Sequence, residues 1–391
     1  MRPDFCSRRS FLGAAAAGGL ALTFGKCLAA PDALLIESPA SGAVLHRRHG
    51  RQSDDGLEIE VRGLAPLEQA VLVNGSPAQR AGKSFRAAVT LREHENEILA
   101  VTDGFAGRQE HRIRVIWDRH SRPRYRFSID DNSFFLRDIA QKQYASLFEC
   151  GYLGMLRDLN RKYGTKFVLN TYFTTGDDFD LTQFPDRYKS EWADNADWLK
   201  LAFHARADKP DRPYQYASPQ QLAADFDAVA EQILRFAGEQ TYSPPTIIHW
   251  GMVLPAALPV LRDRGVRVLS GYFHKSGGLW DVNYHFDAER SEYMSRHDAW
   301  MDFASGIVFS RVDIVCNSVP VDQIVPTLAP LTENPDTAEI MDILTHEQYF
   351  WPFYQHYLPD HPQRLETAVR WLTEQGYQPV FFHEGFLGVP A

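Results

Sequence analysis

The sequence predicts a mixed α/β protein in two parts, a small β-sandwich followed by a larger region of about seven β/α units. Between residues 33 and 118, short segments of alternating apolar and polar residues recur at a spacing of roughly ten residues, which is typical of a sandwich. After residue 124, apolar strands alternate with helical segments. This second pattern indicates parallel strands, arranged either as a barrel or as an open doubly wound sheet.

The first thirty residues resemble a bacterial twin-arginine export signal. Arg8 and Arg9 precede an apolar, Ala/Gly-rich run that ends in small residues near Ala29 or Ala30. We therefore expect residues 1–30 to be removed and the mature protein to be periplasmic or secreted, with no transmembrane segment.

The charge and the cysteine content narrow the range of functions. The formal net charge is −9, which argues against a nucleic-acid partner. Once residues 1–30 are removed, only Cys150 and Cys316 remain, so no disulfide framework is expected to hold the fold. The composition, with 44% hydrophobic residues, is that of an ordinary globular protein.

Residues 31–118 are expected to form the sandwich. Apolar and polar side chains alternate from Leu57 to Val61, and Asn74-Gly75 is a strong hairpin signal. The strands around this hairpin resemble the immunoglobulin-like modules that precede the catalytic domains of secreted bacterial carbohydrate enzymes. The resemblance implies an accessory or spacer module.

Residues 119–391 are expected to form the α/β region. Its predicted strands are "YRFSIDD", "KFVLNTYF", "WLKLAFHA", "PTIIHWG", "VRVLSGYF", "EIMDILTHE" and "YQPVFF". One intervening helix is well delimited, because Ser218 is a good N-cap, Pro219 suits the first helical position and Gly238 supplies the stop. In this architecture the chemistry belongs at the carboxyl ends of the strands.

Carboxylates and imidazoles gather at those predicted strand ends. Adjacent like charges in a buried strand are costly unless a positive group shares the site. A divalent metal with oxygen and nitrogen ligands would satisfy the whole set better than a structural role. The candidates are Asp130 and Asp131 on the first strand, His204 with Asp208 on the third, His249 on the fourth and His346 with Glu347 on a late strand.

The order of these groups resembles the metal-dependent polysaccharide deacetylases, such as the rhizobial chitooligosaccharide deacetylases. "FSIDD" is similar to their first motif, "FHARAD" stands at the second, "IIHWG" at the third and "ILTHE" is similar to the last. The resemblance covers residues 125 to about 350 and implies a distorted (β/α) barrel of about seven strands.

Roles follow from this resemblance residue by residue. Asp130 would be the general base that activates a metal-bound water, and Asp131 and His204 would be metal ligands. His346 would be the general acid that protonates the leaving amine or alcohol. The expected cofactor is a divalent ion, zinc first, with cobalt, iron, manganese or nickel as alternatives.

Two positions depart from the family pattern. Asp208 replaces a histidine and is expected either to serve as an oxygen ligand or to lie on the surface. His249 replaces an arginine and is expected to be a third imidazole ligand, or a catalytic group that orients Asp130 or the substrate. These changes leave a lyase, an epimerase, a glycosidase or a non-catalytic glycan-binding protein as alternatives to a deacetylase.

Aromatic residues near the same strand ends suit a polysaccharide or glycan substrate. Aromatic faces offer large contact surfaces for the C–H faces of sugar rings. Trp250, Tyr272, Trp280 and Tyr214 are the expected substrate-binding residues. Residues 271–287 are expected to form a long functional loop over the site.

Overall fold

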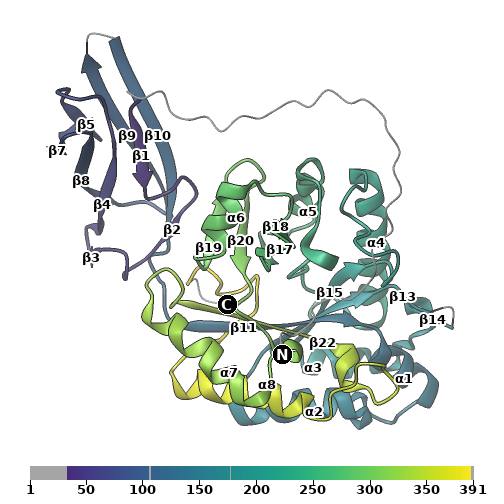
Figure 1. The fold of residues 1–391 in the computed structure, drawn as a ribbon. Coiled ribbons are helices and arrows are strands. Elements are labelled where there is room, and N and C mark those ends of the chain that lie inside the picture. Colours follow the sequence, from purple (N-terminus) through teal and green to yellow (C-terminus); the bar gives the residue numbers. More distant parts are fainter. Residues whose placement is uncertain (1–32, 105–106, 177, 389–391) are drawn as a thin grey trace.

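The structure is a computed structural model that describes residues 33–104, 107–176 and 178–388. The predicted export signal lies outside these residues. Figure 1 shows an all-β part at the upper left and an α/β part below and to the right of it. Within the described residues, no helix is long and apolar enough to cross a membrane.

The N-terminal part consists of ten strands in two five-stranded sheets. One sheet has the order β1-β4-β8-β7 with β3 beside β4, and the other has the order β2-β10-β9-β5-β6. Inward-facing apolar side chains from both sheets share one core, in which Leu57, Val61 and Val115 are fully buried. The all-β prediction for this region is therefore confirmed, while its kinship with immunoglobulin-like modules stays a prediction. The strands are β1 (Leu35–Ser38), β2 (Val44–Leu45), β3 (Arg51–Ser53), β4 (Gly56–Leu64), β5 (Val71–Val73), β6 (Ser76–Pro77), β7 (Gln79–Ala81), β8 (Ser84–Leu91), β9 (Glu95–Gly104) and β10 (Gly107–Trp117).

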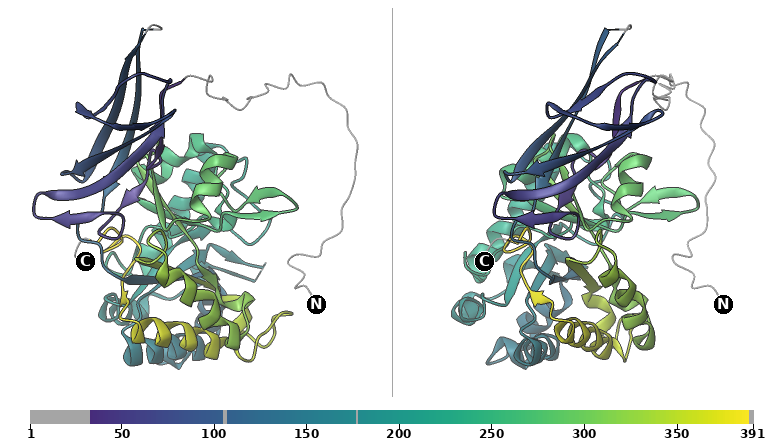
Figure 2. Two further views of the ribbon diagram at one scale, coloured as in Figure 1. Left: turned by 60° about the vertical axis from the view of Figure 1, so that its left-hand side comes forward. Right: turned by 90° about the vertical axis from the view of Figure 1, so that its left-hand side faces the viewer.

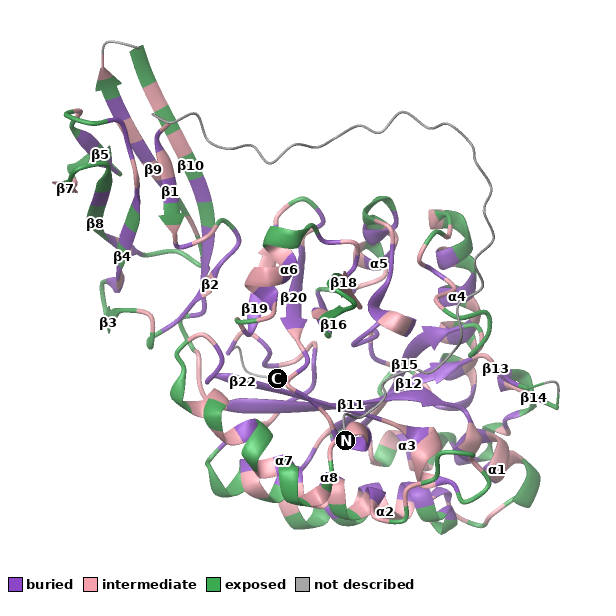
Figure 3. Ribbon diagram, viewed as in Figure 1, coloured by how far each residue is buried: buried purple, intermediate pink, exposed green. Residues whose placement is uncertain are grey.

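A parallel sheet of six strands is the centre of the α/β part. Its order is β15-β12-β11-β22-β21, with the short β23 paired to the start of β11. Every residue of β11 and β12 is buried, as expected for central strands covered on both faces (Figure 3). The strands are β11 (Arg124–Asn132), β12 (Phe167–Tyr172), β15 (Leu199–Ala205), β21 (Ile314–Val315), β22 (Ile340–His346) and β23 (Gln378–Pro379).

Helices cover this sheet, and the views in Figures 1 and 2 place α2, α7 and α8 together on one side of it. The helix predicted after Ser218 is confirmed as α4, and the Ser218 hydroxyl accepts a hydrogen bond from the Gln221 N–H at 3.1 Å. The helices are α1 (Phe134–Lys142), α2 (Gly151–Tyr163), α3 (Lys189–Asp194), α4 (Pro219–Phe236), α5 (Leu258–Asp263), α6 (Ala288–Met294), α7 (Val321–Leu328) and α8 (His361–Glu374).

Smaller sheets complete the α/β part. A three-stranded sheet has the order β16-β20-β19, and two hairpins stand apart from it. The three-stranded sheet consists of β16 (Val268–Gly271), β19 (Ala299–Asp302) and β20 (Ile307–Arg311). The hairpins are β13 (Thr174–Thr175) with β14 (Phe179–Asp180), and β17 (His274–Ser276) with β18 (Leu279–Asp281).

Strand pairing among the described residues does not close a barrel, so the prediction of a seven-stranded barrel is corrected. The fourth predicted strand, "PTIIHWG", does not form, and the segment begins at Pro244 and Pro245, which have no N–H group to donate to a ladder. The segment still runs between the two sheets, where Leu201 N donates to Thr241 O at 2.9 Å and Ser270 N donates to Thr246 O at 2.7 Å. Ser243 N also donates to Leu201 O at 2.9 Å, so the segment makes two backbone hydrogen bonds to β15 and one to β16. The result is a mixed α/β fold whose two sheets are joined there by a few hydrogen bonds.

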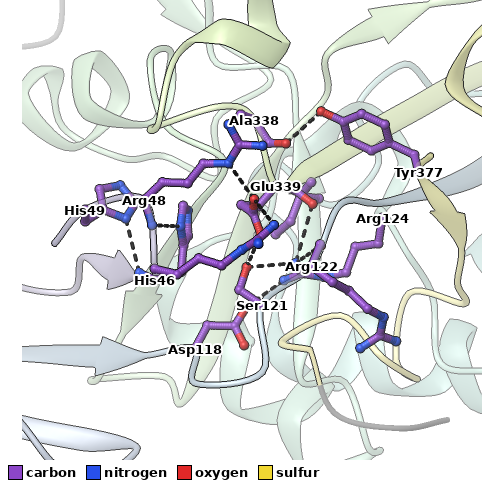
Figure 4. A network of polar contacts seen from close by, with 12 residues as sticks. His46, Arg48, His49, Asp118, Ser121, Arg122, Arg124, Ala338, Glu339 and Tyr377 are labelled. Carbon is purple, nitrogen blue, oxygen red and sulfur yellow. Dashed lines mark hydrogen bonds and ion pairs between the residues drawn. The ribbon is translucent and has the colours of Figure 1, made fainter. Parts of the chain in front are cut away.

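A buried carboxylate joins the all-β part to the α/β part (Figure 4). The Glu339 side chain, 1% exposed, accepts hydrogen bonds from Arg48 Nε at 2.6 Å, Arg47 Nη2 at 3.1 Å and Ser121 Oγ at 2.7 Å. Nearby, His49 Nε2 lies 3.2 Å from a carboxylate oxygen of Asp336. We refer to Arg47, Arg48, His49, Ser121, Asp336 and Glu339 as the joint.

Candidate metal centre

An irregularity in β11 gives the adjacent carboxylates of Asp130 and Asp131 different surroundings. The register between β11 and β12 shifts after Ile129, so that two residues of β11 lie opposite Asn170 alone. Asp131 occupies the extra position and has a left-handed φ of 60°. In a regular strand, neighbouring side chains point to opposite faces, and a bulge is the usual way to re-aim one of them beside a functional site.

Asp131, His204 and His249 come together as a buried group of potential metal ligands. The Asp131 Oδ1 atom lies 3.1 Å from His204 Nε2 and 3.4 Å from His249 Nδ1, and these two nitrogens are 3.0 Å apart. A tetrahedral ion with bonds of about 2.0–2.1 Å holds its ligand atoms about 3.3–3.4 Å apart. The three donor atoms therefore fit a divalent ion such as Zn²⁺ in both chemistry and spacing.

A backbone hydrogen bond orients the His204 ring toward the group of potential ligands. His204 stands on β15, is 1% exposed, and its Nδ1 lies 3.3 Å from the carbonyl oxygen of Ile247. A carbonyl oxygen only accepts, so Nδ1 carries a hydrogen, and Nε2 is the nitrogen that can bind an ion once it has given up its own proton. His249 follows Ile248 in the short 3₁₀ turn η4 (His249–Gly251), directly after the segment that replaces the fourth strand.

The pKa directions show a buried negative charge for which His204, but not His249, gains a proton more readily than a free histidine does. Burial opposes the charge of Asp131, but the hydrogen bond from His204 and the charges of His346 and His249 lower its pKa well below the usual range. Burial also opposes protonation of His204, yet the charges of Asp130 and Asp131 raise its pKa. Burial and the neighbouring His204 charge lower the pKa of His249 to about 3. A bound cation would supply the positive charge that the two carboxylates require.

Asp130 is buried but lies outside the three-ligand group. The Asn170 amide donates a hydrogen bond to its Oδ1 at 2.7 Å, and burial raises its pKa. The parallel pairing of β11 with β22 sets Asp130 directly beside His346. His346 Nδ1 donates to Asn317 Oδ1 at 2.9 Å, which leaves Nε2 as the nitrogen that can exchange a proton.

Glu347 has a structural role at the N-terminus of α1. Its carboxylate is fully buried and accepts hydrogen bonds from the first N–H groups of α1, at 2.6 Å from Ser133 and Phe135 and at 3.0 Å from Phe134. It also accepts from the Trp351 indole at 2.8 Å. A carboxylate at a helix N-terminus satisfies donors that have no partner within the helix.

The structure does not bring Asp208 into the ligand group. Its side chain is 53% exposed, forms an ion pair with Lys209 at 3.6 Å, and belongs to the loop after β15. Of the two alternatives drawn from the sequence, the surface position is the one observed. His249 supplies the third ligand atom of the group instead.

The four aromatic residues expected to bind substrate divide into two kinds. Tyr272 is 37% exposed, while Trp250 and Trp280 are partly exposed, and Trp280 lies on the β17–β18 hairpin. Tyr214 is only 1% exposed, and its hydroxyl contacts the Arg206 N–H at 3.1 Å and an oxygen of Asp225 at 3.2 Å. Tyr214 is therefore a core residue and is withdrawn from the substrate-binding set.

Sequence reasoning missed Asn170, Tyr172 and Asn317. The Tyr172 hydroxyl donates a hydrogen bond to Asp131 Oδ1 and lies 3.1 Å from His249 Nδ1. Asn170 and Tyr172 are two residues apart on β12, so they share a face of the strand. The signal that could have found Asn170 and Tyr172 is the polar second half of the run "FVLNTY" in a strand that otherwise reads as buried.

Comparisons with known proteins add little to this geometry. No family model matches the chain, and no curated protein matches it. Among solved structures, one similar chain is a proposed alpha-galactosidase from Bacteroides fragilis NCTC 9343, at 10% sequence identity. The match covers 88% of this chain and 78% of that chain with a TM-score of 0.22, a value too low to carry an argument.

Proposed function

We propose that the protein is an exported, metal-dependent hydrolase that removes acetyl groups from a polysaccharide or glycan. The observation that carries the proposal is the division between two adjacent buried carboxylates. Asp131 meets His204 and His249 at ligand spacing, whereas Asp130 is held apart by Asn170. A site that only bound a metal would have no use for a second, unligated carboxylate, because burying it is costly.

Asp131, His204 and His249 would hold the ion. When bound, a divalent metal supplies Lewis acidity, which makes a water more acidic and polarises an acyl carbonyl. Asp130 would accept the proton of the attacking water as general base. Its burial and its raised pKa favour a carboxylate that holds this proton well.

His346 would complete the reaction as general acid. Asn317 keeps the hydrogen on His346 Nδ1, so proton exchange takes place at Nε2. From its position beside Asp130, His346 would deliver a proton to the amine or alcohol that leaves as the acetyl group is transferred to water. The acyl carbon gains one oxygen and loses the bond to the leaving group, so the products are acetate and the free amine or alcohol.

The carbohydrate part of the proposal is supported by the partly exposed rings of Trp250, Tyr272 and Trp280. Two of these rings carry a cation against one face, with Arg212 over Trp250 at 4.7 Å and Lys275 over Trp280 at 4.5 Å. Export through the twin-arginine signal would place the enzyme with extracellular or periplasmic glycans.

The test is acetate release from a panel of acetylated glycans by the metal-loaded protein. We expect the wild type to release acetate and Asp130→Asn to lose at least about 100-fold in rate, the usual range for a missing general base, while keeping its metal. Asp208→Asn is the matched control, because Asp208 is an exposed carboxylate outside the ligand group. A loaded wild type that releases no acetate from any glycan of the panel would contradict the deacetylase proposal.

A further inference from the structure

Tyr172 contacts the proposed metal centre through its hydroxyl group. The side chain stands at the carboxyl end of β12 and is 2% exposed. Its O–H donates to Asp131 Oδ1, the same oxygen that lies 3.1 Å from His204 Nε2 and 3.4 Å from His249 Nδ1. The ring of Tyr172 meets the ring of His249 edge-on, with centroids 5.2 Å apart.

This contact restricts the carboxylate of Asp131. A carboxylate on a single χ2 bond can rotate, and each rotation would carry Oδ1 away from the two imidazoles. A donor fixed in the core holds Oδ1 in the position where all three ligand atoms converge. Hydrogen-bond partners of this kind orient metal ligands, and their loss typically weakens metal binding by about 10–100-fold.

The same strand also restrains the other carboxylate. Asn170, two residues before Tyr172, donates to Asp130 at 2.7 Å. The bulge in β11 therefore faces two donors on one face of β12, one for each acid. Asn170 keeps Asp130 away from the ligand group, and Tyr172 keeps Asp131 in it.

We propose that Tyr172 is a positioning residue of the metal centre, which fixes Asp131 as a ligand and thereby sets the affinity for the ion. This inference rests on the metal centre of the proposed function, but it does not depend on the identity of the substrate. It concerns the affinity of the protein for a metal ion, which is measured without any substrate.

The experiment compares the Zn²⁺ affinity of the full-length mature protein and its variants by competition with a chromophoric chelator. We expect Tyr172→Phe to bind Zn²⁺ about 10–100-fold more weakly than the wild type. Tyr125→Phe is the matched control, since Tyr125 is a fully buried tyrosine at the other end of β11 whose hydroxyl lies 2.8 Å from Thr165 Oγ1. Its affinity should stay within about threefold of the wild type, a change of less than 1 kcal/mol.

A second readout separates positioning from a general loss of structure. The visible spectrum of the Co²⁺-loaded protein should change in Tyr172→Phe and stay as in the wild type in Tyr125→Phe, because only the first substitution removes the hydrogen bond that holds Asp131 in place. Thermal unfolding of both variants without metal shows whether they fold. Equal affinities for Tyr172→Phe and wild type, or equal losses in both variants, would overturn the inference and leave the metal centre standing. A folded wild type that binds neither ion would overturn both.

Discussion

Two regions of this molecule bury acidic side chains beside histidines, and they neutralise the negative charge in different ways. At the joint, Glu339 meets the guanidinium groups of Arg47 and Arg48. At the proposed metal centre, Asp131 contacts the imidazoles of His204 and His249. Arginine stays charged at every physiological pH, whereas imidazole can give up its proton and offer a lone pair.

The difference separates a structural site from a chemical one. The joint carries its own permanent counter-charge, so its carboxylate needs nothing from solution. The proposed metal centre obtains counter-charge by protonating an imidazole such as His204, or by exchanging that proton for a cation. Neutralising the carboxylate at the proposed metal centre should therefore weaken metal binding, whereas neutralising the carboxylate at the joint should lower the free energy of unfolding.

The largest expected effect is on metal affinity at the proposed centre. Asp131→Asn keeps an oxygen that can accept hydrogen bonds from Tyr172 and His204 but removes the charge and the best ligand atom. We expect Zn²⁺ affinity to fall by more than about 100-fold, beyond the range for partners that only orient a ligand. Chelator competition measures this, with Glu339→Gln expected to bind as the wild type does. A comparable loss in Glu339→Gln would mean that the two regions are not independent.

The next effect is on stability at the joint. Glu339→Gln removes the charge that two arginines and Ser121 share, and we expect the free energy of unfolding to fall by about 1–3 kcal/mol. The expected loss is smaller than the roughly 3–5 kcal/mol of a broken fully buried pair, because Arg47 and Arg48 are 47% and 36% exposed and can be rehydrated. Urea unfolding at neutral pH without metal measures the change. An unchanged midpoint would show that the joint contributes nothing to stability.

A third prediction concerns the loss of stability as the pH is lowered. His46, next to the joint, is buried, and burial together with the charge of His49 lowers its pKa to about 3. The unfolded chain binds a proton near pH 6.5, so the stability that neutral His46 contributes is present above this pH and is lost as the pH falls towards 3. We expect His46→Gln to reduce the loss of stability by up to about 1.4 kcal/mol per pH unit.

Urea unfolding at pH 7, 6 and 5 tests this difference between wild type and variant. All three pH values lie above 4.5, the ordinary pKa of a glutamate. The partners of Glu339 lower its pKa despite burial, so its contribution to stability is lost only below pH 4.5 and does not affect this comparison. Parallel pH profiles for the two proteins would refute the assignment to His46.

The smallest expected effect is at Asp208. Its exposed carboxylate lies outside the ligand group, so Asp208→Ala should change Zn²⁺ affinity by less than about threefold, the size of a screened surface interaction. A loss as large as that in Asp131→Asn would make Asp208 a ligand after all and would require its loop to move on metal binding.

The sequence alone was sufficient for the all-β region, the alternation of strands and helices, and the strand ends that carry Asp131 and His204. These follow from local periodicity and from the convergence of parallel strand ends. The resemblance favoured a closed barrel over an open sheet, and the strand that a barrel would need after Pro244 and Pro245 is absent from the described residues.

Other features depend on contacts that no local pattern contains. The bulge after Ile129 appears only in the register between two strands. Tyr214 is buried in the core, where its hydroxyl donates a hydrogen bond to Asp225, eleven residues further along the chain. The donors Asn170 and Tyr172 lie in a buried strand, where the sequence does not distinguish them from residues that only pack in the core.

The metal content of the purified protein tests the central claim most directly. We would measure it after reconstitution and desalting for the wild type, His204→Ala, His249→Ala and the joint variant Glu339→Gln. The account predicts one ion per chain in the wild type and in Glu339→Gln, and almost none in the two histidine variants. A wild type that retains no metal, or a His249→Ala variant that retains it fully, would contradict the assignment of this group as a metal centre.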